Sequence, residues 1–125
     1  MRLHILVVDD DADVRPVLVE MLQIAGFLTT PADSGVAMRE ILAGNGPKID
    51  AVVLDCRIPG VPSAQFALHA KSMRLPVVMI SGHVGTMQFA AENGLQLLRK
   101  PFHMADLLSA VREAIASGEF GQRAA

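Results

Sequence analysis

The chain has 125 residues, the usual length of one domain, and with 51% hydrophobic residues it cannot be mainly disordered. Its formal net charge of −2 argues against direct binding to nucleic acid, and its single cysteine excludes an internal disulfide. The apolar runs are too short to span a membrane, and the N-terminus lacks the pattern of a signal peptide. We therefore expect a cytoplasmic protein without a membrane partner.

Five short apolar segments indicate the strands of a sheet. They lie at residues 3–8, 27–30, 51–54, 77–80 and 95–98. The third and fourth segments are apolar without alternation, which is typical of strands covered on both faces. Pro31 follows the second segment, and because proline has no N–H it predicts that this strand lies at an edge of the sheet.

A stretch with helical periodicity follows each apolar segment. The stretches lie within residues 14–25, 36–42, 66–73, 87–91 and 107–115. Gly26, Gly44 and Gly94 mark the ends of the first, second and fourth stretches. Pro16 fits only the first turn of a helix, so we expect the first helix to start near Asp13.

This repeated order of strand and helix predicts an α/β fold, a five-stranded parallel sheet doubly wound with helices on both faces, of the (βα)5 type. We expect the strand order 2-1-3-4-5. The helical pattern is lost near the end of the chain. We therefore expect residues 1–117 to form the domain and residues 118–125 to form a flexible C-terminal tail.

Polar residues follow the strands at the end where open α/β sheets bind their ligands. Asp9 and Asp10 follow the first strand, Asp55 the third, Ser81 the fourth and Lys100 the fifth. In the expected strand order the carboxylates converge, and a cation would relieve their repulsion. Carboxylate oxygens completed by water describe a Mg²⁺ site. A nucleophilic carboxylate, a metal, an ammonium group and a hydroxyl together suit a phosphoryl group carried on a carboxylate.

Four motifs in the same order carry a resemblance to a known family. They are Ile5–Asp11, Val53–Gly60, Ile80–Gly82 and Lys100–Phe102. In these motifs the sequence resembles the receiver domain of bacterial two-component response regulators. The likeness covers the chain from about Leu3 to Ala116, within the same fold of doubly wound sheets.

The resemblance implies a set of metal ligands. Asp10 would bind Mg²⁺ directly, Asp9 would bind it through water, and Asp55 would belong to the same metal site. The backbone carbonyl of Arg57 would complete the protein ligands.

The resemblance also implies how the phosphoryl group is received. Asp55 would be the phosphoacceptor, and the donor would be a sensor histidine kinase or a histidine phosphotransfer protein. Ser81 would donate a hydrogen bond to the phosphoryl group and move when it arrives. Lys100 would pair with the phosphate, or with Asp55 before it, and the Lys100–Pro101 peptide would be cis.

The sequence departs from the family pattern at three places. Pro62 and Ser63 stand where the family commonly has Asp-Gly, so the loop that enters the third helix should take another conformation. Leu97 stands where Tyr or Phe is usual, and it has no ring or hydroxyl to switch. The segment from Ser81 to Lys100 is shorter than usual by about three residues, roughly one helical turn, so we expect a short or partly irregular fourth helix.

The leading hypothesis is a stand-alone receiver, a phosphorylatable switch of a two-component system or phosphorelay rather than an enzyme. It would signal through contacts with a downstream protein partner and could form a weak homodimer. We interpret Cys56 as a packed small residue and Asp11 as a helix cap or a solvated charge.

Three alternatives stay open. A degenerate receiver would act as a binding module that no longer takes phosphate. A phosphatase of the haloacid dehalogenase type would also use an aspartate, Mg²⁺ and a lysine, but its nucleophile ends the first strand, which leaves Asp55 unexplained. A flavin-binding module would need a phosphate-binding loop after the first strand, where this chain has Asp9–Asp11.

Overall fold

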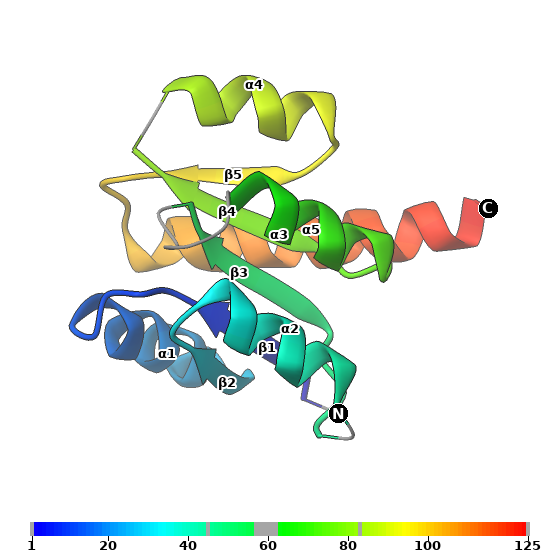
Figure 1. Cartoon of the computed structure of the whole chain (residues 1–125). Coiled ribbons are helices and arrows are strands. Elements are labelled where there is room, and N and C mark those ends of the chain that lie inside the picture. The colour runs from blue at the N-terminus through cyan, green and yellow to red at the C-terminus, as the bar shows by residue number, and fades with distance from the viewer. Residues whose placement is uncertain (1, 45, 57–62, 83, 125) are drawn as a thin grey trace.

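A parallel sheet of five strands forms the middle layer of the molecule (Figure 1). The computed structural model describes residues 2–44, 46–56, 63–82 and 84–124, with the backbone alone for residues 84–85 and 118–124. The strands are β1 (His4–Val8), β2 (Leu28–Ala32), β3 (Ala51–Asp55), β4 (Val77–Ser81) and β5 (Gln96–Arg99). The helices are α1 (Val14–Ile24), α2 (Gly35–Ala43), α3 (Ser63–Ser72), α4 (Val84–Glu92) and α5 (Met104–Ala124).

The strand order is β2-β1-β3-β4-β5, and every neighbouring pair is parallel. This order confirms the predicted topology. It also confirms that Pro31 lies on an edge strand, because β2 pairs with β1 alone. The predicted and observed strands differ at their ends by only one or two residues, a common difference at the ends of elements.

Two hydrophobic clusters cover the two faces of the sheet. On one face the side chains of Leu18 and Leu22 from α1 pack with those of Leu107 and Val111 from α5. On the other face α2, α3 and α4 contribute a cluster that includes Phe66. Figure 1 shows α1 and α5 on the opposite side of the sheet from α2 and α3. The doubly wound arrangement explains why β3 and β4 are buried at every position and apolar up to their final residues.

The helices α2 and α3 meet at a glycine. A Cβ atom on Gly35 would lie 2.0 Å from ring atoms of Phe66, which is fully buried. The guanidinium carbon of Arg39 lies 4.9 Å from the centre of the same ring. The absence of a side chain at Gly35 therefore lets the Phe66 ring pack directly against the start of α2.

The ends of α1 follow the predicted signals. Asp11 accepts hydrogen bonds from the backbone N–H groups of Asp13 at 2.8 Å and Val14 at 3.1 Å. The Asp11 side chain thus satisfies N–H groups at the start of α1, as a capping side chain does. Because α1 begins at Val14, Pro16 lies in its first turn, as predicted. Gly26, just after the helix, has a φ of +98°, which a residue with a side chain rarely adopts.

The last two helices differ in length. α4 has nine residues, about two and a half turns, so the prediction of a short fourth helix is confirmed, and the helix is continuous. α5 continues to Ala124, so the backbone is helical past residue 117, where we place the end of the domain from the sequence. That boundary stays a prediction. Among the described residues, no helix is both long and apolar enough to cross a membrane.

Candidate phosphoacceptor site

The strand register brings the predicted site residues to one level at the carboxyl end of the sheet. Val8 pairs with Leu54, so the next residues, Asp9 and Asp55, lie side by side. Asp55 pairs with Ile80 and stands beside the position of Ser81. Backbone hydrogen bonds between neighbouring chains continue just past the ends of the strands. The Asp9 N–H donates to the Ala32 carbonyl and the Lys100 N–H donates to the Ser81 carbonyl, which holds the backbone at this edge in place.

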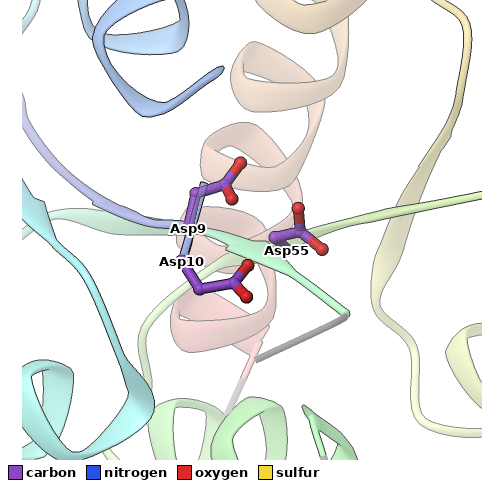
Figure 2. A group of neighbouring side chains, drawn as sticks. All are labelled: Asp9, Asp10 and Asp55. Atoms are coloured by element: carbon purple, nitrogen blue, oxygen red, sulfur yellow. The ribbon is translucent and has the colours of Figure 1, made fainter. Parts of the chain in front are cut away.

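The carboxylates of Asp9, Asp10 and Asp55 form a cluster. Each contributes an oxygen, and these oxygens lie within 4.8 Å of one another. Figure 2 shows the side chains of Asp9 and Asp10 next to each other, with that of Asp55 beside them. Asp9 and Asp55 are buried and Asp10 is exposed, so the cluster opens to solvent on the side of Asp10.

The buried environment changes the acidity of Asp9. Its side chain is 1% exposed, and burial, with the nearby charge of Asp55, raises the pKa of Asp9 from 3.8 to about 6. One oxygen, Oδ1, accepts a hydrogen bond of 2.9 Å from the Asp11 N–H. The other, Oδ2, is buried without a hydrogen-bond partner in the described part of the chain. The fold therefore holds an acceptor oxygen ready for a ligand.

Lys100 supplies the positive charge of the site. Its Nζ donates a 3.1 Å hydrogen bond to Asp55 Oδ2, which is also an ion pair. The Lys100–Pro101 peptide is cis, as expected from the sequence. The lysine side chain is 31% exposed and that of Asp55 is 6% exposed, so the ammonium group lies at the mouth of the cluster. The pair matches the contact that the resemblance implies before phosphate arrives.

Ser81 is buried at the end of β4, and its hydroxyl oxygen lies 3.0 Å from that of Thr86 in α4. Thr86 was not among the site residues expected from the sequence, although its hydroxyl stands only five positions after Ser81. Arg15 was not expected there either, and its guanidinium donates a 2.8 Å hydrogen bond to the backbone carbonyl of Asp9. Arg15 thus ties the first turn of α1 to the acidic loop.

Cys56 directly follows Asp55, and its side chain packs against the hydrophobic cluster on the face of the sheet that α2, α3 and α4 cover. Burial, with the charge of Asp55, raises the pKa of the Cys56 thiol from 9.0 to about 12. The side chain is therefore a neutral thiol at physiological pH. This agrees with its interpretation as a packed small residue.

Two expectations from the sequence fall in the loop after β3. Arg57, the predicted carbonyl ligand, and Pro62 both lie outside the described residues. Ser63 is described and is the first residue of α3. Leu97 is partly buried and packs against the hydrophobic cluster on the face of the sheet that α2, α3 and α4 cover. It has no hydrogen-bonding group to offer Ser81.

The donor set fits a small divalent cation. Mg²⁺ prefers oxygen ligands and is typically held by one or two carboxylates together with water. The three clustered carboxylates, the buried oxygen Oδ2 of Asp9 and the open side at Asp10 meet these requirements. The residues present are therefore compatible with Mg²⁺.

Comparison with known proteins gives a consistent result. Residues 5–112 match the family described as the response regulator receiver domain. The chain is 32% identical over 122 residues to the transcriptional regulatory protein FixJ of Bradyrhizobium diazoefficiens, covering 93% of this chain and 58% of that protein. It is 31% identical over 118 residues to the C4-dicarboxylate transport transcriptional regulatory protein DctD of Pseudomonas aeruginosa, covering 90% of this chain and 25% of that protein. The chain thus spans only part of the length of these relatives.

Solved structures agree with the sequence comparison. A response regulator receiver protein from Sinorhizobium medicae is 35% identical, with a TM-score of 0.81 over 94% of this chain and 97% of that chain. A response regulator receiver domain protein from Clostridium thermocellum is 26% identical, with a TM-score of 0.84 over 94% of this chain and 98% of that chain. The family match spans most of the chain, from β1 into α5. The chain therefore belongs to the response regulator receiver domain family, a family of signalling domains.

Proposed function

We propose that the chain is a phosphoacceptor switch that takes a phosphoryl group on Asp55 in a Mg²⁺-dependent reaction. The observation that carries the proposal is the position of Asp55. Its carboxylate is buried, paired with Lys100 at 3.1 Å, and clustered with Asp9 and Asp10. Such a carboxylate lies beside a cation and beside oxygens that could hold a metal.

The proposed donor is the phosphohistidine of a sensor histidine kinase or of a histidine phosphotransfer protein. An Asp55 carboxylate oxygen would form a bond to phosphorus as the bond between phosphorus and the donor nitrogen breaks, and the imidazole would leave with the electron pair of that bond. Lys100 would balance the negative charge on the phosphoryl oxygens, and Ser81 would donate a hydrogen bond to one of them. The buried edge of the sheet would hold these groups in place during the transfer.

Asp9, Asp10 and Asp55 would hold the Mg²⁺ ion, together with the backbone carbonyl of Arg57, which lies outside the described residues. When bound, the ion would neutralise carboxylate charge and polarise phosphoryl oxygens. Arg15 would keep the Asp9 backbone in place through its hydrogen bond to the carbonyl.

The switch would act through protein contacts. We propose a downstream protein partner, with a weak homodimer as a further form, and no direct contact with nucleic acid or membrane. We also propose a cytoplasmic location, since a free thiol such as that of Cys56 suits a reducing compartment. The self-phosphorylation and self-dephosphorylation of the domain would be its only chemistry.

The experiment is the intact mass of the protein after incubation with a small phosphodonor and Mg²⁺. The proposal expects one added phosphoryl group, which is absent in Asp55→Asn and absent without Mg²⁺. Asp13→Asn is the matched control, because Asp13 is an exposed aspartate outside the cluster and should still give the adduct. If the wild type binds Mg²⁺ but forms no adduct, the phosphorylation-independent binding module replaces this proposal. Steady-state release of phosphate from small phosphomonoesters would instead favour a phosphatase.

A further inference from the structure

A closed ring of hydrogen bonds joins the loop after β1 to the first turn of α1. The Asp11 N–H donates to Asp9 Oδ1 at 2.9 Å, and the Asp11 carbonyl accepts from the Arg15 N–H at 2.9 Å. The guanidinium of Arg15 returns to the start of the loop, where its Nη1 donates to the backbone carbonyl of Asp9 at 2.8 Å. The side chain of Arg15 therefore closes the ring, and breaking this one contact opens it.

The ring holds the peptide groups on both sides of Asp10. The carbonyl of the peptide group that joins Asp9 to Asp10 accepts from Arg15. The N–H of the next peptide group, that of Asp11, donates to Asp9 Oδ1. Because peptide groups are planar, the backbone at Asp10 can turn only about its φ and ψ angles. Two held peptide groups therefore hold both angles, and with them the direction in which the Asp10 side chain leaves the backbone.

Asp10 depends on this support more than the other two carboxylates of the cluster do. Asp9 and Asp55 are buried, so packing restricts their side chains, whereas Asp10 is exposed. Its carboxylate nevertheless contributes an oxygen to the group that lies within 4.8 Å. An exposed loop residue loses conformational entropy when a ligand orders it. A backbone that is already held in place reduces that loss.

We infer that Arg15 is a positioning residue for the metal site, which orders the backbone of Asp9 and Asp10 before an ion binds. This inference rests on the proposed function, because it takes the three clustered carboxylates to be the Mg²⁺ site. Groups that orient metal ligands without touching the metal typically contribute roughly 10- to 100-fold to metal affinity. A guanidinium suits this role because it keeps its charge and all its donors at physiological pH.

The charge of Arg15 and its positioning role predict opposite effects on Mg²⁺ binding. If the guanidinium acted only as a charge, its removal would relieve repulsion of the ion and tighten binding. If it acts by positioning, its removal frees the Asp9 carbonyl, loosens the loop and weakens binding. The sign of the change in affinity therefore tells the two roles apart.

Positioning also predicts that Mg²⁺ stabilises the ring. Linkage requires that two coupled equilibria affect each other by the same factor. If the closed ring raises the affinity for Mg²⁺ about tenfold, bound Mg²⁺ must favour the closed ring about tenfold. The first turn of α1, which holds no residue of the carboxylate cluster, should therefore open less often when the site is loaded.

The test is calorimetric titration of the whole chain with Mg²⁺. Arg15→Met keeps an unbranched side chain and removes the charge and the donors, and it should bind Mg²⁺ about tenfold more weakly than the wild type. Arg112→Met is the matched control, because Arg112 is exposed in α5 outside the ring. Gly35→Ala controls for a general loss of stability, because it disturbs only the contact between α2 and α3. Both controls should bind Mg²⁺ as the wild type does.

Hydrogen exchange gives a second readout that a merely structural role would not move. The backbone amide of Arg15 donates within the ring, so its exchange requires the ring to open. In the wild type, saturating Mg²⁺ should slow this exchange about tenfold. In Arg15→Met the ring cannot close, so Mg²⁺ should leave the exchange rate at position 15 nearly unchanged.

The outcomes separate this inference from the proposed function. If the wild type does not bind Mg²⁺, both fail. If the wild type binds Mg²⁺ and Arg15→Met binds it equally well or more tightly, the positioning role is wrong and the proposed function stands. Weaker binding by Gly35→Ala as well would also contradict the positioning role, because the loss would then follow stability. If Arg15→Met does not fold, the exchange measurement on the wild type decides, and an unchanged rate at position 15 overturns the inference.

Discussion

Lys100 Nζ and Asp55 Oδ2 lie 3.1 Å apart, in an ion pair that joins residues 45 positions apart in the chain. Lys100 brings a positive charge to the edge of the sheet where the carboxylates of Asp9, Asp10 and Asp55 cluster. The lysine therefore partly neutralises the carboxylates in the absence of a metal ion. An added cation must compete with the lysine charge for this site.

Replacing Lys100 by methionine tests this competition. Lys100→Met should bind Mg²⁺ at least about fivefold more tightly, because one nearby positive charge contributes about 1 kcal/mol of repulsion even in a water-like dielectric. The same variant should form the phosphoryl adduct more slowly, since no ammonium group neutralises the phosphoryl oxygens. Calorimetric titration with Mg²⁺ measures the first effect and intact mass over time the second. Lys48→Met is the control, because Lys48 is exposed in the segment that precedes β3 at its other end. Weaker Mg²⁺ binding by Lys100→Met would contradict the competition.

The raised pKa of Asp9 predicts a pH dependence. Its pKa is about 6 in the folded protein, above the ordinary 3.8, so the folded state binds a proton more tightly than the unfolded state. The stability that this proton provides is fully present below pH 3.8 and is lost as the pH rises through about 6. Without metal, the contribution of Asp9 to the free energy of unfolding should therefore decrease as the pH rises from 3.8 to about 6.

Mg²⁺ binding should show the opposite trend with pH. The metal needs the ionised carboxylate, so its affinity should fall as the pH drops below about 6. Urea unfolding at several pH values gives the stability, and calorimetry gives the affinity. In Asp9→Asn the stability step should vanish, and at pH 7 this variant should be more stable than the wild type because no buried charge remains. An Asp9→Asn protein less stable than the wild type at pH 7 would oppose this assignment.

The contact between Gly35 and Phe66 predicts the effect of a single methyl group. Gly35→Ala places a Cβ 2.0 Å from a fully buried ring, so either the ring or α2 has to shift. Overpacking of this kind costs about 1–3 kcal/mol, which urea unfolding would detect. Gly46→Ala is the matched control, because a Cβ there meets no atom within 4 Å. Equal stability of the two variants would mean that the ring can move aside.

The thiol of Cys56 should react slowly. Its pKa of about 12 leaves very little thiolate at pH 8, and it is the thiolate that reacts with alkylating agents. Iodoacetamide should therefore modify the native protein far more slowly than the same protein unfolded in guanidinium chloride, as followed by mass. Equal rates in the two states would show that the thiol is not protected by burial.

The positions of the site residues could be predicted from the sequence because they depend on strand order and on strand ends. Asp9 and Asp55 each come at or just after the end of an apolar run, and parallel strands place such ends at one edge. The Lys100–Asp55 contact follows from the same register. The start and the end of α1 could also be predicted, because Asp11 and Gly26 act on backbone groups only a few residues away in the chain.

Contacts between helices and the sheet could not be predicted in this way. Thr86 meets Ser81 only because α4 begins at Val84, whereas the apolar pattern suggested a start near Met87. The close approach of Gly35 and Phe66 depends on the distance between α2 and α3, which periodicity does not contain. Arg15 reaches the Asp9 carbonyl through a flexible side chain whose direction the sequence does not fix.

The proline of β2 limits how this sheet can grow. The Leu28 N–H donates inward to the Leu3 carbonyl of the chain before β1, and peptide groups alternate in direction along a strand. At Pro31, three residues later, a hydrogen-bond donor would therefore point outward, and proline has none. Another strand that approached this edge would find a gap in its ladder of hydrogen bonds. β2 is thus protected against edge-to-edge pairing with a second chain, a common route to aggregation.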